Sequence, residues 1–513
     1  MNRDRLAIVA AALAAGLTVG VHHAAASDPA PSFDAVFKPV RDGSPDVTAI
    51  AVSETIRGLP AGKLLVLSAP VIYAGVPGIA DRVKNLAVED DKGDVPITVS
   101  EDAKVPGGFP YYRHWTAGRP TTGAVKVTFR SRVQSPDAAR GPPFGIRAVA
   151  GGVSGAGSGF LVFPQMGAAD LHASWDVSDL APGSVGIASW GEGDTRWRDT
   201  PRSLTQAWII AGPVSRYPTK GSAPRTLGGF SAAWLGQAPF DAPAEMAWAG
   251  RLYAYFAKQY RYLDPPPPYR VFMRFLPAGP GVGGGTALPR SFMLSALASP
   301  PKPGATAPHG TLAHEMTHQW VGGIAEPDGI NSWFSEGLTT YFSALIPKRG
   351  GFATMDEWSR EVARIAESYY AYPARTWSAA KIAEAGFGDE AIRHIPYSRS
   401  ALYFADIDAR IRAKSGGRRR LEDALQPIFR SREKGVRFDH AAWKAFLAKE
   451  LGADEAARWE RIVIDGELFT PGEDAFGPCF ERKPATYDFQ GQALDGYQFV
   501  RVNGVAEAKC LAW

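Results

Sequence analysis

The first half of the chain alternates apolar and polar positions in the way that is typical of half-buried β-strands. In AVKVTFRSRV, the apolar Val125, Val127 and Phe129 are separated by single charged or hydroxyl residues, and this period of two places one face of a strand in a core. Further β-prone runs, KLLVLSAPVIY, GFLVF and AWIIAGPV, lie between clusters of Gly, Pro and Asp up to about Val214. The pattern predicts a β-rich, sandwich-like domain, which we place at residues 27–235.

Helical spacing replaces this alternation after about Asp241. Apolar residues recur at helical intervals up to the tetraproline of LDPPPPYR, where the helix is expected to end. YRVFMRFL and RSFMLSA then predict strands on either side of a glycine-rich loop, and most of the later chain is expected to be helical. Thr354 and Glu357 in TMDE predict a capping box at the start of one helix. We therefore expect an α+β protein with a mixed, mostly helical second domain at 236–468 and a short tail at 469–513.

Composition and charge exclude several classes of protein. The 513 residues, 45% hydrophobic and 21% charged, are typical of a soluble globular protein with room for roughly two or three domains. A net charge of +4 from 56 basic and 52 acidic residues is too small and too mixed to predict a nucleic-acid or anionic-membrane partner. Beyond the N-terminal segment, no stretch approaches the length of an apolar membrane span.

The N-terminus has the features of an export signal. MNRDR is a short basic region, LAIVAAALAAGLTVGV is apolar, and the alanines at 24–26 end in a cleavage motif. We predict a signal peptide at residues 1–26, cleaved after Ala26, and hence a periplasmic or secreted protein. The alternative is an uncleaved membrane anchor, because the apolar stretch is almost long enough to span a bilayer.

Only two cysteines occur, Cys479 and Cys510, both near the C-terminus. In an oxidising compartment two nearby cysteines most simply form one disulfide, which would close the tail. Two free, buried thiols are the alternative.

The segment LAHEMTHQWVGG carries the first chemical signal. His314 and His318 are four residues apart, so on a helix both imidazoles share a face and can converge on one zinc ion. A catalytic zinc needs a third protein ligand, and Glu336 is the candidate because it lies on the next predicted amphipathic helix, in NSWFSEGLTTYF. Glu315, beside a ligand, would accept a proton from the activated water. Alone, Glu336 would be a surface carboxylate; after H-E-x-x-H, the set predicts hydrolysis at one Zn²⁺ ion.

Two stretches resemble known peptidase families. HEMTHQWVGG is similar to the aminopeptidase N family, whereas WFSEGLTTYF and PYSRSALYFADIDARIRAKSGGRRRLEDAL resemble the glycyl aminopeptidase family more closely. Both are gluzincin metallopeptidases, in which a glutamate on the next helix completes the zinc site. The resemblance covers approximately residues 240–465 and implies a thermolysin-like catalytic domain, a zinc cofactor and a peptide or protein substrate. Fewer than 50 residues follow, too few for the PDZ domain with which that family often ends.

The resemblance also implies a second catalytic group. In both families a tyrosine before the later helix donates its hydroxyl to the tetrahedral intermediate, and Tyr397 in PYSRSAL stands at this place. A phenol proton opposite the zinc would stabilise the developing oxyanion. Arg399 and Ser400 stand where the family usually has Lys and Gly, so the local backbone is expected to differ.

One segment departs from the aminopeptidase pattern. These families bind the substrate ammonium with a glutamate in a strand beside the zinc, and Ala287 in GGGTALPRS occupies that place. We expect Gly284, Gly285 and Thr286 to contact the substrate backbone along a strand edge, with a plain hairpin loop as the alternative.

Three hypotheses follow: an aminopeptidase-like enzyme, an endopeptidase or a peptidase acting on blocked N-termini, and a non-catalytic zinc-containing binding protein. The presence of Glu315 and Tyr397 argues against the last hypothesis, because a structural zinc site needs neither a base nor an oxyanion donor.

Overall fold

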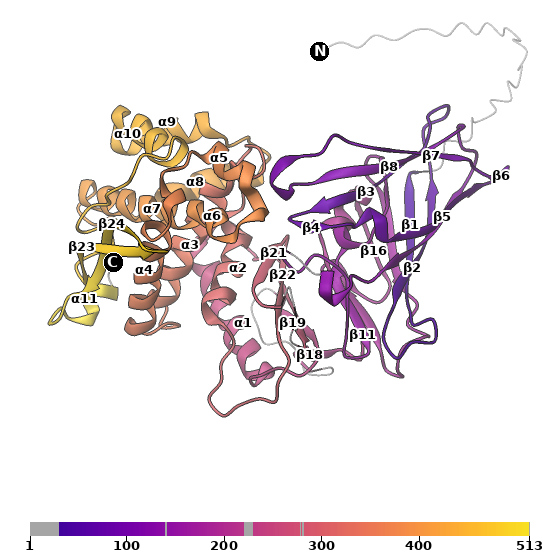
Figure 1. Ribbon diagram of the computed structural model, residues 1–513, viewed down its shortest axis with the longest axis horizontal. Helices are drawn as coiled ribbons and strands as arrows, with labels where there is room; N and C mark the ends of the chain where they lie inside the picture. Colours follow the sequence, from indigo (N-terminus) through magenta and orange to yellow (C-terminus); the bar gives the residue numbers. More distant parts are fainter. Residues whose placement is uncertain (1–29, 139–140, 220–228, 278, 280–281, 512–513) are drawn as a thin grey trace, which may run out of the picture.

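The computed structural model describes residues 30–138, 141–219, 229–277, 279 and 282–511. The predicted signal peptide at 1–26 lies outside the described residues. A β-rich N-terminal region and a helical C-terminal region lie side by side (Figure 1), so the predicted α+β class is confirmed.

Three sheets build the N-terminal region. The largest has seven strands in the order β16-β13-β1-β2-β9-β5-β6. Their bounds are β1 (Ser32–Val40), β2 (Ala49–Arg57), β5 (Val83–Asp90), β6 (Gly93–Asp94), β9 (Val125–Arg132), β13 (Ala169–Trp175) and β16 (Thr195–Asp199). The alternation predicted for β9 is confirmed, because Val125, Val127 and Phe129 are buried in the core while Lys126 is exposed.

Two five-stranded sheets complete this region. The first runs β12-β3-β8-β7 with β4 beside β3, and comprises β3 (Val66–Tyr73), β4 (Val76–Pro77), β7 (Ile97–Glu101), β8 (Tyr111–Ala117) and β12 (Phe163–Pro164). The second runs β10-β11-β17-β14-β15, and comprises β10 (Arg147–Val149), β11 (Gly152–Ala156), β14 (Val185–Ala188), β15 (Gly191–Glu192) and β17 (Trp208–Gly212).

A fourth sheet joins the two regions. Its order is β18-β19-β20-β22-β21, with β18 (Ser215–Tyr217), β19 (Ser231–Leu235), β20 (Arg270–Leu276), β21 (Gly285–Leu288) and β22 (Ser291–Leu297). Successive residues of β20 face opposite ways: Val271 and Met273 belong to the helical core, whereas Phe272 and Leu276 pack with strands of the N-terminal region. β18 and β19 precede the boundary expected after residue 235, yet they pair into this sheet.

Ten helices, all within the described residues, form the rest of the C-terminal region. They are α1 (Ala242–Tyr260), α2 (His309–Val321), α3 (Ser332–Arg349), α4 (Met355–Tyr370), α5 (Ala379–Ala385), α6 (Glu390–Arg393), α7 (Ile395–Lys414), α8 (Leu421–Glu433), α9 (His440–Leu451) and α10 (Ala453–Trp459). The capping box predicted at Thr354 and Glu357 is present at the start of α4. Among the described residues, no helix combines the length and the apolar character needed to cross a bilayer.

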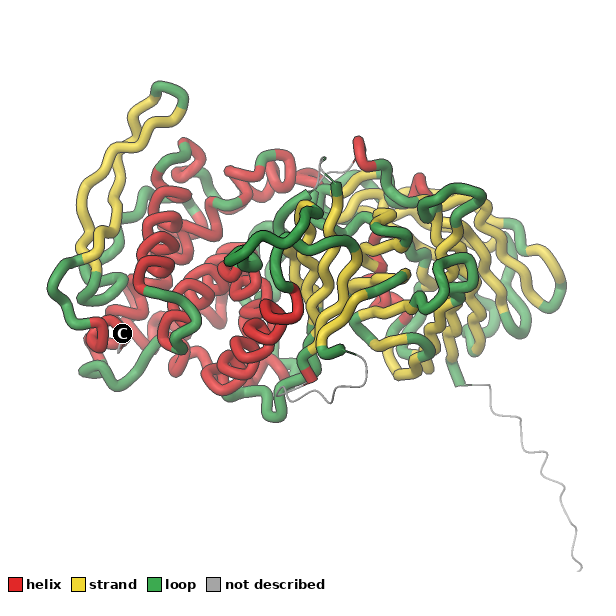
Figure 2. The backbone as a smooth tube through the Cα atoms, turned by 90° about the horizontal axis from the view of Figure 1, so that it is seen from below, coloured by secondary structure: helices red, strands yellow, loops and turns green. Residues whose placement is uncertain are grey.

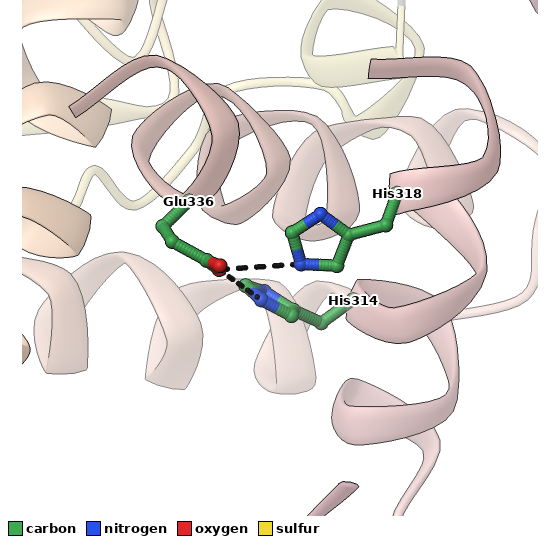
Figure 3. Close-up of side chains that lie close together, drawn as sticks. All are labelled: His314, His318 and Glu336. Carbon is green, nitrogen blue, oxygen red and sulfur yellow. Dashed lines mark hydrogen bonds and ion pairs between the residues drawn. The ribbon is translucent and has the colours of Figure 1, made fainter. Parts of the chain in front are cut away.

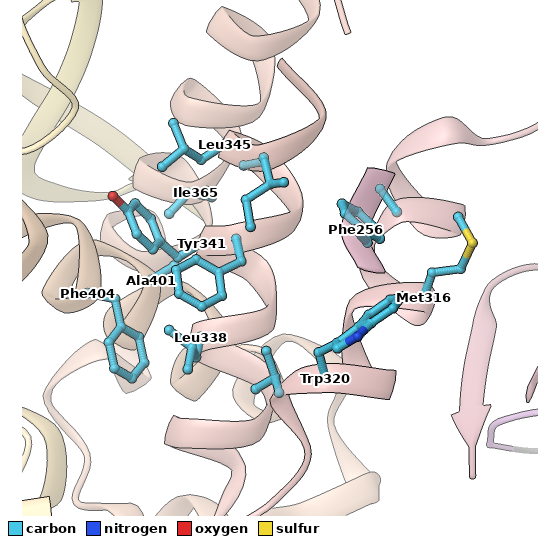
Figure 4. Packing of buried hydrophobic residues seen from close by; sticks show 14 of the residues in the cluster. Phe256, Met316, Trp320, Leu338, Tyr341, Leu345, Ile365, Ala401 and Phe404 are labelled. Carbon is cyan, nitrogen blue, oxygen red and sulfur yellow. The ribbon is translucent and has the colours of Figure 1, made fainter. Parts of the chain in front are cut away.

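The helical core fixes the orientation of α2. Figure 4 shows side chains of α1, α2, α3, α4 and α7 converging, with Met316 and Trp320 of α2 fully buried. The Trp320 ring stacks on Tyr260 at 5.3 Å between centroids, and the Tyr262 hydroxyl donates to the Trp320 carbonyl. Because one face of α2 is committed to this core, its opposite face is directed toward α3.

The tail is a hairpin tied by a disulfide. β23 (Phe480–Phe489) and β24 (Gln492–Arg501) pair antiparallel, and the short α11 (Glu507–Leu511) follows. Cys479 and Cys510 are bonded, which confirms the predicted disulfide. Figure 2 shows the hairpin at the end of the helical region away from the N-terminal sheets, where Arg501 pairs with Asp356 of α4 at 2.9 Å.

Candidate active site

The three predicted metal ligands converge between α2 and α3. His314 and His318 project from one face of α2, and Glu336 projects toward them from the first turns of α3 (Figure 3). The Oε2 atom of Glu336 lies 3.2 Å from the Nε2 atom of His314 and 3.2 Å from that of His318. Among the described residues these three form the one cluster of His, Cys, Asp or Glu side chains able to surround a metal ion.

The spacing of these atoms fits zinc. Ligand atoms that each lie ~2.0 to 2.2 Å from a tetrahedral zinc are about 3.3 Å from one another, close to the two distances of 3.2 Å found here. Two imidazole nitrogens and one carboxylate oxygen are a donor set that zinc prefers, and three protein ligands leave one position open. His314, His318 and Glu336 are therefore the residues that would bind the ion.

Thr339 orients one of the histidines. Its Oγ1 lies 3.3 Å from the Nδ1 of His318, and the hydroxyl can accept from Nδ1–H while Nε2 faces the metal position. Such a contact fixes the tautomer and the ring orientation of a metal ligand. Sequence reasoning missed Thr339, although its place three residues after Glu336 on α3 puts both side chains on one helix face.

Mutual electrostatics prepare Glu336 and His318 for this role. Burial alone would raise the pKa of Glu336, but the adjacent His318 and His314 outweigh it and keep that pKa well below its usual range. Burial alone would lower the pKa of His318, and Glu336 more than compensates, so the pKa of His318 is raised. The site therefore favours an ionised carboxylate.

Glu315 lies beside this cluster, next to β21. Only 7% of the residue is exposed, and burial raises the pKa of its carboxyl although the Ala287 amide donates a hydrogen bond to it. Gly285 is equally close: a Cβ atom there would lie 3.0 Å from Cγ of Glu315 and 2.9 Å from Cγ2 of Thr311. Position 285 therefore needs glycine if Glu315 is to keep its place.

The edge of β21 forms one wall of the site. β21 pairs antiparallel with β22, and the Ser295 amide donates to the Gly284 carbonyl at 3.0 Å. In an antiparallel pair the hydrogen-bonded residues alternate, so the backbone of Thr286 faces β22 while that of Gly285 and Ala287 faces away. Of the three residues predicted to contact a substrate backbone, only Gly285 thus presents free-edge groups, and Ala287 does so in addition.

Tyr397 reaches the site from the first turn of α7. Its ring lies parallel to the His314 ring, with 6.0 Å between centroids and 8° between planes. Burial raises the pKa of Tyr397 well above its ordinary value, so the hydroxyl keeps its proton. The neighbouring His394 packs edge-on against the same ring at 4.8 Å, and burial lowers the pKa of His394 to about 4.

The matching segment of a known family contains this cluster. Residues 308–394 match the family model described as M61 glycyl aminopeptidase. The predicted resemblance to the glycyl aminopeptidase family is confirmed over these residues. Among curated proteins no sequence matches significantly.

Solved structures share the fold over most of the chain. An aminopeptidase N family protein from Idiomarina loihiensis superimposes with a TM-score of 0.67 at 13% identity, covering 88% of this chain and 79% of the other. An M1 zinc metallopeptidase from Deinococcus radiodurans, bound to a Tyr-Ser-Ala substrate, gives a TM-score of 0.53 at 17% identity over 86% of this chain and 95% of its own. Yeast LTA4 hydrolase in complex with bestatin gives 0.51 at 12% identity, over 86% and 69%. These structures show the shared fold, and the family match over residues 308–394 supports a peptidase.

The two departures from the glycyl aminopeptidase pattern have structural roles. Arg399 is buried and donates to the carbonyls of Arg375 and Trp377 at 2.8 and 2.7 Å. Ser400 packs against α3, where a Cβ atom at Gly337 would lie 2.3 Å from that of Ser400. These residues fasten α7 to its surroundings and leave Tyr397 facing the metal ligands.

Proposed function

We propose that the protein is an exported, zinc-dependent peptidase that hydrolyses peptide bonds in an aminopeptidase-like manner. The observation that carries this proposal is the convergence of two imidazole nitrogens on one carboxylate oxygen at 3.2 Å, with Glu315 and Tyr397 close to this cluster. A purely structural zinc site would use neither of these two groups.

Each side chain has a defined task in hydrolysis. When bound, zinc lowers the pKa of a coordinated water toward ~7 and polarises the substrate carbonyl. Glu315 takes a proton from the attacking water as the new C–O bond forms, and returns it to the amide nitrogen as the C–N bond breaks. Tyr397 donates a hydrogen bond to the carbonyl oxygen while that oxygen gains negative charge. The products are a carboxylic acid and an amine, so atoms and protons balance.

The edge of β21 supplies the substrate-binding wall in this proposal. An extended peptide would pair with the outward backbone groups of Gly285 and Ala287, as a strand added to a sheet edge. The Ala287 amide already donates to Glu315, and the Thr286 hydroxyl donates to the Gly285 carbonyl at 2.6 Å. The Gly285 amide and the Ala287 carbonyl are therefore the groups that remain for substrate.

The aminopeptidase assignment has one specific rival. Ala287 has no carboxylate to bind a free ammonium, which favours an endopeptidase or a peptidase for blocked N-termini. A peptide library in which every sequence is present both free and N-acetylated separates the two. Removal of one residue from free peptides alone supports the aminopeptidase, cleavage of acetylated peptides supports the rival, and cleavage of neither by the zinc-loaded protein contradicts the peptidase proposal.

Export forms a separate part of the proposal. It rests on the basic, apolar and alanine-ending segments within residues 1–26. N-terminal sequencing of the protein expressed in a bacterial host should give a chain beginning at Ser27. A chain retaining the apolar segment in the membrane fraction would support the anchor instead.

A further inference from the structure

A single arginine contacts the hydroxyl of Tyr397. Arg393 ends α6, one helical turn before Tyr397, and its Nη1 donates to the tyrosine oxygen at 3.0 Å. A guanidinium has donors only, whereas a phenol has one proton to donate and an oxygen that accepts. In this contact the tyrosine oxygen is therefore the acceptor, and the hydroxyl proton remains available for a second hydrogen bond.

The unused proton is available to an acceptor in the candidate active site. No described residue accepts a hydrogen bond from the Tyr397 hydroxyl. The ring lies parallel to the His314 imidazole with 6.0 Å between centroids, so the tyrosine lies beside the candidate metal ligands. The Tyr397 hydroxyl can therefore donate to an acceptor on the substrate, such as the carbonyl oxygen.

Aromatic contacts fix the guanidinium in place. Its Cζ lies 5.4 Å from the centre of the Phe387 ring and 5.8 Å from that of Tyr397. Phe387 is itself pressed against the N-terminal region: a Cβ atom at Gly75 would lie 2.7 Å from that of Phe387, and the Phe109 ring lies 5.7 Å away. The contact between the two regions thus holds the Phe387 ring in place against Arg393.

A simpler role for Arg393 is an ordinary pair at the end of a helix. Glu390 is its carboxylate partner, at 3.8 Å and with 79% of its side chain exposed. Exposed ion pairs of this kind contribute little to stability. The shorter hydrogen bond to Tyr397 and the two ring contacts therefore define the position of the guanidinium better than the pair with Glu390 does.

We propose that Arg393 is a positioning residue for Tyr397: it fixes the hydroxyl oxygen so that the O–H points at the oxygen of the scissile carbonyl. The inference rests on the proposed peptidase function. It makes Arg393 act through Tyr397 and not through substrate directly.

A double-mutant cycle tests this dependence. Kinetic constants are measured for the wild type, Arg393→Met, Tyr397→Phe and the double variant, all loaded with zinc. Arg393→Met should lower kcat about tenfold with little change in KM, the effect of one lost charge-assisted hydrogen bond. In the Tyr397→Phe background the same substitution should lower kcat by less than about twofold. An equal loss in both backgrounds, or a loss confined to KM, would overturn the proposal.

Two further variants exclude a structural explanation. Arg393→Lys keeps a donor and should recover part of kcat, while Glu390→Gln removes the exposed pair and should leave kcat unchanged. If Arg393→Met unfolds, the test rests on Arg393→Lys. A wild-type kcat in Arg393→Lys together with a lowered kcat in Glu390→Gln would count against the proposal.

A phosphinic peptide distinguishes failure of this inference from failure of the proposed function. Its tetrahedral phosphinate resembles the transition state, so its affinity should fall about tenfold in Arg393→Met but less than about twofold in the Tyr397→Phe background. Wild-type protein that neither cleaves peptides nor binds the phosphinate would refute the peptidase itself. Wild-type activity with additive losses in the cycle would refute only the role of Arg393.

Discussion

The Oγ1 of Thr339 lies 3.3 Å from the Nδ1 of His318, on the side of the imidazole opposite the cluster of metal ligands. A threonine on α3 thus orients a ligand on α2, and the contact joins the two helices that form the site. In the proposed zinc site this relationship would give Thr339 a role in metal affinity without direct contact to the ion.

Thr339→Val should weaken zinc binding while preserving the fold. Valine has the same shape but no hydroxyl, so the His318 ring loses the partner that fixes its orientation, a loss worth ~10- to 100-fold in metal affinity. Competition with a chromophoric chelator measures the affinity. Thr340→Val is the matched control, because its buried Oγ1 has no hydrogen-bond partner in the described chain and zinc affinity should not change. Equal affinity in both variants would remove Thr339 from the metal site.

Glu315→Gln should bind zinc and lose turnover. The amide cannot accept the proton of the attacking water, whereas His314, His318 and Glu336 are untouched. Metal content by mass spectrometry should stay at one zinc per chain, and kcat should fall by at least about 10²-fold. An active variant would mean that another group is the base, and loss of metal would mean that Glu315 supports the ligand cluster.

Gly285→Ala should reduce activity through the same carboxylate. The added methyl group would meet Cγ2 of Thr311 at 2.9 Å and Cγ of Glu315 at 3.0 Å, so the base or the strand must move. Misplacement of a reacting group by about 1 Å can cost ~10²-fold in rate. Gly323→Ala, just after α2 and with open space where the added Cβ would lie, is the control and should retain activity. Similar kcat values in both variants would show that β21 accommodates the methyl group.

The two histidines of the candidate metal site were predictable because their signal is local, whereas Glu336 comes from a second helix. His314 and His318 share a helix face by spacing alone, and the capping box at Thr354 needs only four consecutive residues. Strand β9 was predictable for the same reason, since its period of two requires no knowledge of the neighbouring strands. In each case the physical cause lies within one element.

Other features depend on packing between elements and escaped sequence reasoning. No strand was predicted at β19, and its pairing with β20 depends on a neighbouring element, so it could not be foreseen. The outward backbone groups of Gly285 and Ala287 follow from the register with β22. The contact from Arg393 to Tyr397 spans one turn, yet its orientation depends on Phe387 and the N-terminal region.

The burial of Glu54 predicts that the stability of the N-terminal domain depends on pH. It lies on the core face of β2 with 0% exposure, and neither carboxyl oxygen has a hydrogen-bond partner among the described residues. Burial raises its pKa well above the ordinary value. The folded state therefore retains this proton more strongly than the unfolded chain does, so its contribution to stability is complete below the unfolded pKa of about 4.3 and is lost as pH rises through the folded pKa.

Replacing Glu54 by leucine should remove that loss. The free energy of unfolding of Glu54→Leu should exceed that of the wild type at pH 7, and the difference should shrink by about 1.4 kcal/mol for each pH unit descended within this window. Urea unfolding at several pH values between 5 and 8 measures it, in roughly half-unit steps chosen to resolve the slope. Glu54→Gln is the control: it should lack the same pH slope but be less stable than the leucine variant, because its amide stays buried without a partner. Parallel curves for wild type and leucine variant would show that Glu54 does not titrate within that range, and a leucine variant less stable at every pH would show that the carboxyl has a compensating partner.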